Sequence, residues 1–139
     1  MNTKLGATMP SPIVENMIAR TAIPVVDADT VTDFIKQSPR AVLFFCADPK
    51  KYPESNDVAM ALPEIIKEYD GLAGALVAQS CEIALQKEFN FTAWPALAFF
   101  KEGQYLGAIT GIQNWDDYLE KINQMFAKDL SATIATVNL

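Results

Sequence analysis

Thiol chemistry is the first possibility that the reactive side chains of this chain suggest, and their spacing argues against it. The two cysteines, Cys46 and Cys81, lie far apart and form no metal-binding or redox motif. A dithiol enzyme needs two thiols close together, one attacking as a thiolate and one resolving the mixed disulfide. The chain also has no histidine, so it lacks the usual general base and the commonest metal ligand. We therefore expect no catalytic residues, no cofactor and no metal site.

The composition is that of one folded domain. The 139 residues are 50% hydrophobic and 20% charged, a balance typical of globular chains. The net charge of -6 argues against a nucleic-acid binder, which normally carries a basic surface. No long apolar run marks an export signal or a membrane span. Together with the two unpaired cysteines, this predicts a protein of the reducing cytoplasm.

Alternating strand and helix patterns predict the order β-α-β-α-β-α-β-β-α after an N-terminal arm. The apolar run Ala41–Cys46 is typical of a central strand that is buried on both faces. Parallel strands with right-handed crossovers come first, and a hairpin at residues 101–103 adds an antiparallel edge. The predicted fold is therefore an α/β three-layer α/β/α sandwich with a mixed central sheet.

The same patterns set the expected boundaries. Ser11 is expected to cap a short helix that buries Ile13, and Asp57 is expected to cap the long helix after a loop over residues 48–56. The helix near residues 81–89 is expected to bury Ile83. The predicted parts are an N-terminal arm with a short helix (1–23), the main domain (24–127) and a C-terminal tail (128–139).

Three local features, together with the order of the elements, resemble the thioredoxin family. The strand that ends at Cys46 runs into a loop and then into a helix that contains Pro63. Trp94-Pro95 directly precedes a strand, as the cis-proline of that family does. The segment Phe99–Gly103 is similar to the hairpin that follows. The resemblance implies a thioredoxin-like fold over about residues 24–127.

The redox pair of that family is missing from this chain. Aligning the two on Pro63 puts Ser55 and Val58 where the two cysteines would stand. Neither side chain can exchange disulfides. The frame therefore predicts a binding protein rather than an enzyme.

Four segments carry a second, narrower resemblance. They are Asp48–Asp57, Glu64–Tyr69, Trp94–Ala96 and Gly111–Trp115. Together they resemble the HupG/HyaE family of hydrogenase expression/formation proteins. This resemblance implies a thioredoxin-like, non-catalytic chaperone for the maturation of uptake [NiFe] hydrogenase. The implied partners are the twin-arginine signal peptide of the small-subunit precursor, bound before export, and other hydrogenase accessory proteins.

Six residues are candidates for binding such a peptide. They are Glu54, Asp57, Glu64, Glu68, Trp94 and Pro95. The carboxylates can pair with guanidinium groups, and the Trp94-Pro95 turn can pair through its backbone with an extended peptide. Glu54 and Asp57 are preferred to the other two acids because they are expected to lie in the loop. The alternatives that stay open are a solvated helix face, a helix cap and a turn that closes the core.

Two other functions also stay open. A single-cysteine thiol-disulfide oxidoreductase would need Cys46 or Cys81 to be exposed with a lowered pKa. A structural subunit would hold a hydrogenase maturation complex together through an apolar face. Against the first, an unpaired cysteine is more often a small buried hydrophobic residue than a reactive one.

Overall fold

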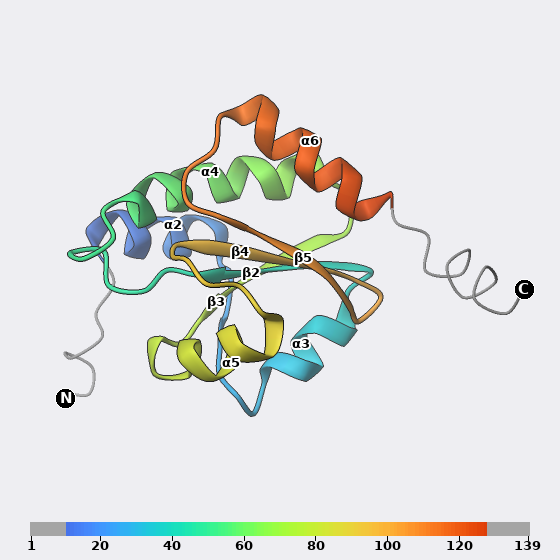
Figure 1. Ribbon diagram of the computed structural model, residues 1–139, viewed down its shortest axis with the longest axis horizontal. Helices are drawn as coiled ribbons and strands as arrows, with labels where there is room; N and C mark the ends of the chain where they lie inside the picture. Colours follow the sequence, from blue (N-terminus) through green and yellow to red (C-terminus); the bar gives the residue numbers. More distant parts are fainter. Residues whose placement is uncertain (1–10, 128–139) are drawn as a thin grey trace, which may run out of the picture.

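A five-stranded mixed sheet of order β1-β3-β2-β4-β5 forms the centre of the computed structural model, which describes residues 11–127 (Figure 1). The strands are β1 (Val25–Val26), β2 (Arg40–Phe45), β3 (Leu72–Val77), β4 (Ala96–Lys101) and β5 (Gln104–Thr110). The helices are α2 (Pro12–Thr21), α3 (Val31–Gln37), α4 (Glu54–Glu68), α5 (Glu82–Phe89) and α6 (Trp115–Phe126), with a 3-10 turn η1 (Gln79–Cys81). The pairs β1–β3 and β3–β2 are parallel, and the pairs β2–β4 and β4–β5 are antiparallel.

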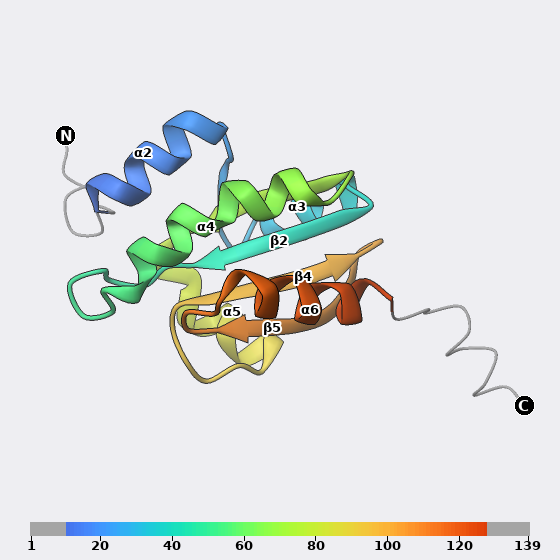
Figure 2. The ribbon, with the colours of Figure 1, turned by 90° about the horizontal axis from the view of Figure 1, so that it is seen from above.

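Helices cover both faces of this sheet. In Figure 1, α4 and α6 lie above the sheet, and α3 and α5 lie below it. The view from above places α2 beside α4 (Figure 2). The predicted three-layer α/β fold is therefore confirmed. The tail predicted over 128–139 lies outside the described residues.

Strand β2 explains why the sequence folds in this way. Its side chains alternate between the two faces, because successive residues of a strand point in opposite directions. Val42 and Phe44 enter the core under α4 and α6, and Leu43 and Phe45 enter the core against α3 and α5. All four are fully buried. A continuous apolar run is the pattern that such a two-sided strand requires.

The N-terminal helix packs into the core above the sheet. Ser11 caps it as expected, since its Oγ accepts a hydrogen bond from the Val14 N–H at 3.2 Å. Val14 and Met17 are buried, whereas Ile13 is 41% exposed. The expectation that Ile13 is buried was wrong. The next residue, Val14, takes the buried place, because the helix packs against α4 with the side that carries Val14 and Met17.

Helix α4 begins earlier than the sequence indicated. Its first residue is Glu54, and its cap position is Pro53, which makes no side-chain capping bond. Asp57 lies in the first turn and is not the cap. Two backbone turns shorten the expected loop, because Tyr52 N–H donates to the Asp48 carbonyl and Ser55 N–H donates to the Tyr52 carbonyl.

The remaining elements follow from local rules. The β4–β5 hairpin turns at Glu102 and Gly103, which both have positive φ, as two-residue hairpin turns of this hand require. Asn90 ends α5 in the left-handed conformation. None of the helices within residues 11–127 has the length and apolar content that crossing a bilayer requires.

Candidate functional site

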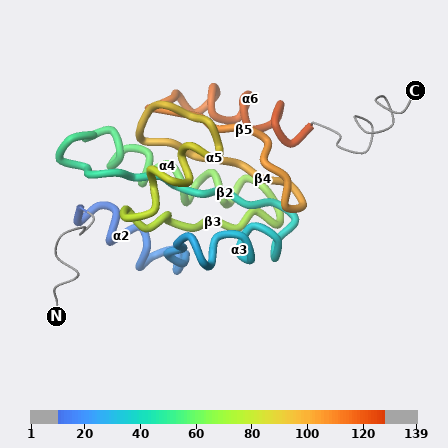
Figure 3. Tube along the Cα trace, turned by 60° about the horizontal axis from the view of Figure 1, so that its bottom comes forward, coloured from blue at the N-terminus to red at the C-terminus, as the bar shows by residue number. Residues whose placement is uncertain are grey.

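Three segments that are distant in sequence meet where β2 and β3 end. One is the loop from Ala47 to Pro53, which follows β2. The second is η1 with the start of α5, which follows β3. The third is the turn before β4, where the Trp94-Pro95 peptide bond is cis. Figure 3 shows the loop after β2 at the same end of the molecule as the segment that joins β3 to α5.

Glu82, the first residue of α5, joins these three segments. Its side chain is buried, with only 3% of the residue exposed. The Ala47 N–H donates to both carboxylate oxygens, at 2.9 and 3.1 Å. The Trp94 indole Nε1–H donates to Oε1 at 2.6 Å. One carboxylate therefore ties the end of β2 to the turn before β4.

The surroundings of Glu82 alter its titration. Burial raises the pKa of this carboxyl to about 7, because the charged form loses its hydration. The hydrogen bonds from Ala47 and Trp94 act in the opposite direction, since both favour the charged form. Glu82 therefore changes charge near neutral pH.

A hollow on one side of Glu82, which we call the Trp94 pocket, has a volume of about 240 Å³. It is lined by Ala47, Asp48, Lys51, Tyr52, Gln79, Glu82, Ile83 and Trp94. The Tyr52 and Trp94 rings stand 6.4 Å apart between centroids. Ile83, which was expected to be buried, is 65% exposed at the rim. The lining combines apolar and aromatic side chains with two acids, Glu82 and Asp48, and one cation, Lys51. Such a mixture suits a peptide ligand or a ligand with a cationic group.

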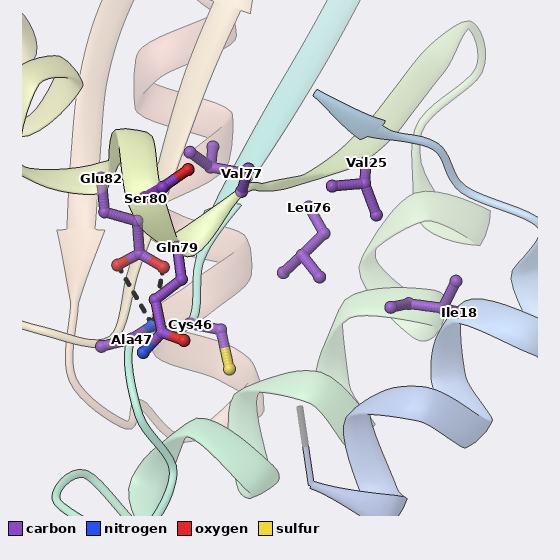
Figure 4. Close-up of a pocket in the computed structure, with 10 residues that line it drawn as sticks. Ile18, Val25, Cys46, Ala47, Leu76, Val77, Gln79, Ser80 and Glu82 are labelled. Carbon is purple, nitrogen blue, oxygen red and sulfur yellow. Dashed lines mark hydrogen bonds between the residues drawn. The ribbon is translucent and has the colours of Figure 1, made fainter. Parts of the chain in front are cut away.

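A second hollow, which we call the Cys46 pocket, is also lined by Glu82 and has a volume of about 200 Å³ (Figure 4). It is lined by Ile18, Val25, Cys46, Ala47, Leu76, Val77, Ala78, Gln79, Ser80 and Glu82. Figure 4 shows the Glu82 carboxylate directed at Ala47, with an apolar wall of Ile18, Val25 and Leu76 beyond. The two hollows therefore share Ala47, Gln79 and Glu82 in their linings.

The positions that would carry thiols in a thioredoxin are closed. Ser55 is fully buried, and its hydroxyl donates to the Cys46 carbonyl oxygen at 2.5 Å. Val58 is buried in the core above the sheet. Burial raises the pKa of the Cys46 thiol to about 12, so this cysteine stays a neutral thiol at physiological pH. Cys81 is half-buried in η1.

The four candidate acids on α4 are spread along the helix rather than gathered in one site. Glu54 and Asp57 lie in the first turn, near the end of β2, and all four are exposed. Glu64 and Glu68 lie roughly 15 and 21 Å further along the helix axis than Glu54, at a rise of about 1.5 Å per residue. Glu64 forms an exposed ion pair with Lys67 at 3.5 Å.

The Trp94-Pro95 turn occupies the place that the sequence predicted for it. Trp94 is half-buried and lines the Trp94 pocket, and Pro95 is buried. The Pro95 carbonyl accepts a hydrogen bond from the Gly111 N–H at 2.8 Å, which fixes the turn against the end of β5. Of the six candidates, only Trp94 reaches either hollow around Glu82.

Residues 13–118 match the family described as Hydrogenase-1 expression protein HyaE. The chain belongs to this HyaE family. Among related proteins, the hydrogenase expression/formation protein HoxO of Azotobacter vinelandii is 37% identical over 84% of this chain and 78% of its own. The corresponding HupG of Rhizobium leguminosarum bv. viciae is 34% identical over 92% of this chain and 89% of its own.

Solved structures agree with the HyaE assignment. A hydrogenase expression/formation protein HupG from Rhodopseudomonas palustris superposes with a TM-score of 0.54 at 40% identity, covering 75% of this chain and 95% of its own. Mitochondrial thioredoxin 3 from Saccharomyces cerevisiae superposes with a TM-score of 0.60 at 24% identity, covering 73% and 92%. The second match supports the thioredoxin-like fold alone.

Sequence reasoning about this HyaE-family chain missed Glu82. It stands beside Cys81 and before exposed Ile83, in a helix with weak periodicity. Nothing local distinguishes it from the other acids. Its partners are 35 and 12 positions away. The signal available was an acid a few residues after a buried strand, where strand ends converge, because Glu82 lies five positions after Val77, the last residue of β3.

Proposed function

We propose that this chain is a non-catalytic binding protein for the maturation of uptake [NiFe] hydrogenase. In this proposal it recognises the twin-arginine signal peptide of the small-subunit precursor in the cytoplasm, before export. One observation carries the proposal: the thiol positions are taken by buried Ser55 and Val58, while the adjoining Trp94-Pro95 turn borders an open pocket. A thioredoxin-like fold that has no thiol pair but has an open pocket at the same place is suited to binding.

Exposed apolar side chains on the two pockets and after the segment that bonds to Pro95 support a peptide partner. Ile83, Val25 and Ile112 are large apolar residues that are each about half exposed or more. Ile83 rims the Trp94 pocket, Val25 lines the Cys46 pocket, and Ile112 follows Gly111, which bonds to Pro95. An extended peptide beside the turn can cover such side chains while it pairs with backbone groups.

The acids of α4 have a supporting role in this proposal. Glu54 and Asp57 stand nearest the end of β2, with Glu64 and Glu68 further along the same helix. Exposed carboxylates attract a cationic segment at a distance and raise the association rate more than the affinity. The net charge of -6 acts in the same direction.

Calorimetry with a synthetic small-subunit signal peptide tests the proposal. We expect the peptide with the Arg-Arg pair to bind at least tenfold more tightly than a peptide in which Gln-Gln replaces the pair, because charge-assisted hydrogen bonds contribute about 1.5–3 kcal/mol each. A scrambled peptide of the same composition is the control. Equal, weak binding by all three peptides would refute the signal-peptide role.

Pull-down of the small subunit without its leader separates leader recognition from a structural role in a larger complex. Under our proposal, removal of the leader abolishes capture, and retained capture would favour the structural role. An insulin-reduction assay tests the non-catalytic part. We expect no activity above the buffer rate, because Cys46 stays a neutral thiol and the thiol positions of a thioredoxin hold Ser55 and Val58.

A further inference from the structure

Glu82 is a buried carboxylate that forms no ion pair with a cation among residues 11–127. Across residues 11–127, the one ion pair is Lys67–Glu64 on the surface of α4. The Glu82 carboxylate accepts hydrogen bonds from two donors, the Ala47 N–H and the Trp94 indole. A carboxylate has about four acceptor positions. Buried carboxylates are normally paired with a cation, because an unpaired buried charge is costly.

The hollow next to this carboxylate has the features that a guanidinium group needs. Guanidinium is planar and weakly hydrated, it stacks on aromatic rings, and it binds carboxylates through a fork of N–H donors. The Trp94 pocket is lined by the Tyr52 and Trp94 rings, by exposed Ile83 and by Glu82. Asp48 and Lys51 complete its charged lining. Its volume of about 240 Å³ can admit the end of an arginine side chain.

Other cations fit this pocket less well. Divalent metal ions take several oxygen ligands, and Asp48 is the other carboxylate that lines it. Among the described residues, no group of three acids, cysteines or histidines could hold a metal. A lysine ammonium is strongly hydrated and gains little from apolar walls.

We infer that Glu82 is the residue that binds the guanidinium group of an arginine side chain inserted into the Trp94 pocket. This inference rests on the proposed function, because it assigns that arginine to the Arg-Arg pair of the signal peptide. It replaces the exposed acids of α4 as the main arginine-binding group. Trp94 then has two roles, as a wall for the arginine and as a donor that orients the carboxylate.

The first experiment compares two matched variants by calorimetry at pH 8. Glu82→Gln removes the buried charge, and Glu88→Gln removes an exposed charge from the same helix. We expect Glu82→Gln to bind the Arg-Arg peptide about tenfold more weakly and to lose most discrimination against a Lys-Lys peptide. Glu88→Gln should match the wild type. Unchanged affinity and discrimination in Glu82→Gln would overturn the inference.

The second experiment uses pH and the unmodified protein. With the pKa of Glu82 at about 7, arginine binding requires proton release, and affinity should fall about tenfold from pH 8 to pH 6. At pH 7, calorimetry in buffers of different ionisation enthalpy should detect the release of about half a proton per peptide. No proton release would contradict the inference, and this measurement needs no folded variant.

Comparing the wild type with Glu82→Gln also controls for other groups around the pockets that could cause a pH dependence. Cys46 and Asp48 follow β2, and Lys51 and Tyr52 lie in the loop. All four are present in both the wild type and Glu82→Gln. A pH dependence that disappears in Glu82→Gln therefore belongs to Glu82, and one that persists would count against it.

A third measurement separates this inference from the proposed function. N-acetyl-arginine amide is titrated into the protein while the Trp94 indole N–H signal is followed by NMR. If the wild type ignores the signal peptide, the proposed function fails. A Trp94 shift that arginine amide causes in the wild type but not in Glu82→Gln would still support the arginine site. No shift in either protein would overturn it.

Discussion

The acids of α4 and Glu82 of α5 are the same kind of group in opposite environments. Glu54, Asp57, Glu64 and Glu68 stand in water along one helix, and Glu64 has an exposed lysine partner. Glu82 is buried, lines two hollows and receives hydrogen bonds from the backbone and from an indole. Exposed charges are screened within about 10 Å at 0.1 M salt. A buried charge is screened much less. Because burial removes water from its charged form, its pKa is shifted.

This comparison teaches that the number of acids in a segment is a poor guide to where a buried and oriented carboxylate lies. The α4 acids supply exposed charges that are spread along one helix and screened by salt. Glu82 supplies one defined acceptor with fixed geometry. Specific binding of a guanidinium group depends on the second kind of site, because its desolvated walls and oriented oxygens discriminate between cations.

The largest predicted effect concerns the dependence of stability on pH. The folded-state pKa of Glu82, about 7, exceeds its ordinary value of 4.5. The native state therefore holds the proton more tightly, and the free energy of unfolding should fall by on the order of 3 kcal/mol as pH rises from 4.5 to 7. Urea unfolding of the wild type and Glu82→Gln measures this. Parallel pH profiles for the two proteins would contradict the buried-acid assignment.

Trp94→Phe should have the next largest effect. The variant keeps an aromatic ring and loses the Nε1–H that bonds to Glu82 at 2.6 Å. We expect a loss of about 2 kcal/mol at pH 8, where the carboxylate is charged. Because that bond lowers the pKa of Glu82, its loss raises this pKa further, and the fall in stability with rising pH should extend to higher pH. Trp115→Phe, on exposed Trp115, is the control and should leave the pH profile unmoved.

Ser55→Ala tests the closed thiol position in the first turn of α4. The buried Ser55 hydroxyl donates a hydrogen bond to the Cys46 carbonyl oxygen. The substitution removes this donor from the buried oxygen. We expect a loss of about 1 kcal/mol in the free energy of unfolding. Ser80→Ala, at an exposed serine, should change it by less than about 0.5 kcal/mol. Equal effects in the two variants would show that Ser55 is not a structural anchor.

The smallest effects should come from the exposed acids. Glu54→Gln and Asp57→Asn remove favourable charges from the first turn of α4, at a cost of about 0.3–1 kcal/mol each. Glu64→Gln should cost less than about 0.5 kcal/mol, since its ion pair with Lys67 is exposed. Peptide affinity should fall by about threefold or less, and the difference should disappear at 0.5 M salt. An effect on peptide affinity as large as that of Glu82→Gln would show that the exposed acids contribute as much to binding as Glu82 does.

The sequence by itself determined the fold and the family. The two-sided strand Ala41–Cys46, the alternation of elements and the Trp94-Pro95 step are local patterns, and each follows from the periodicity and conformational limits of a few neighbouring residues. The absence of a thiol pair near the α4 start is also visible in the letters alone.

Only the tertiary structure decided which acid matters. Glu82 meets Ala47 and Trp94 because the ends of β2 and β3 and the turn before β4 converge at one edge of the sheet. Burial, hydrogen-bond partners and the pKa all depend on that convergence, which no local pattern encodes. The start of α4 depended on it too, since Ser55 is held by the Cys46 carbonyl at the end of β2. Long-range contacts therefore turned one ordinary glutamate into the candidate binding group.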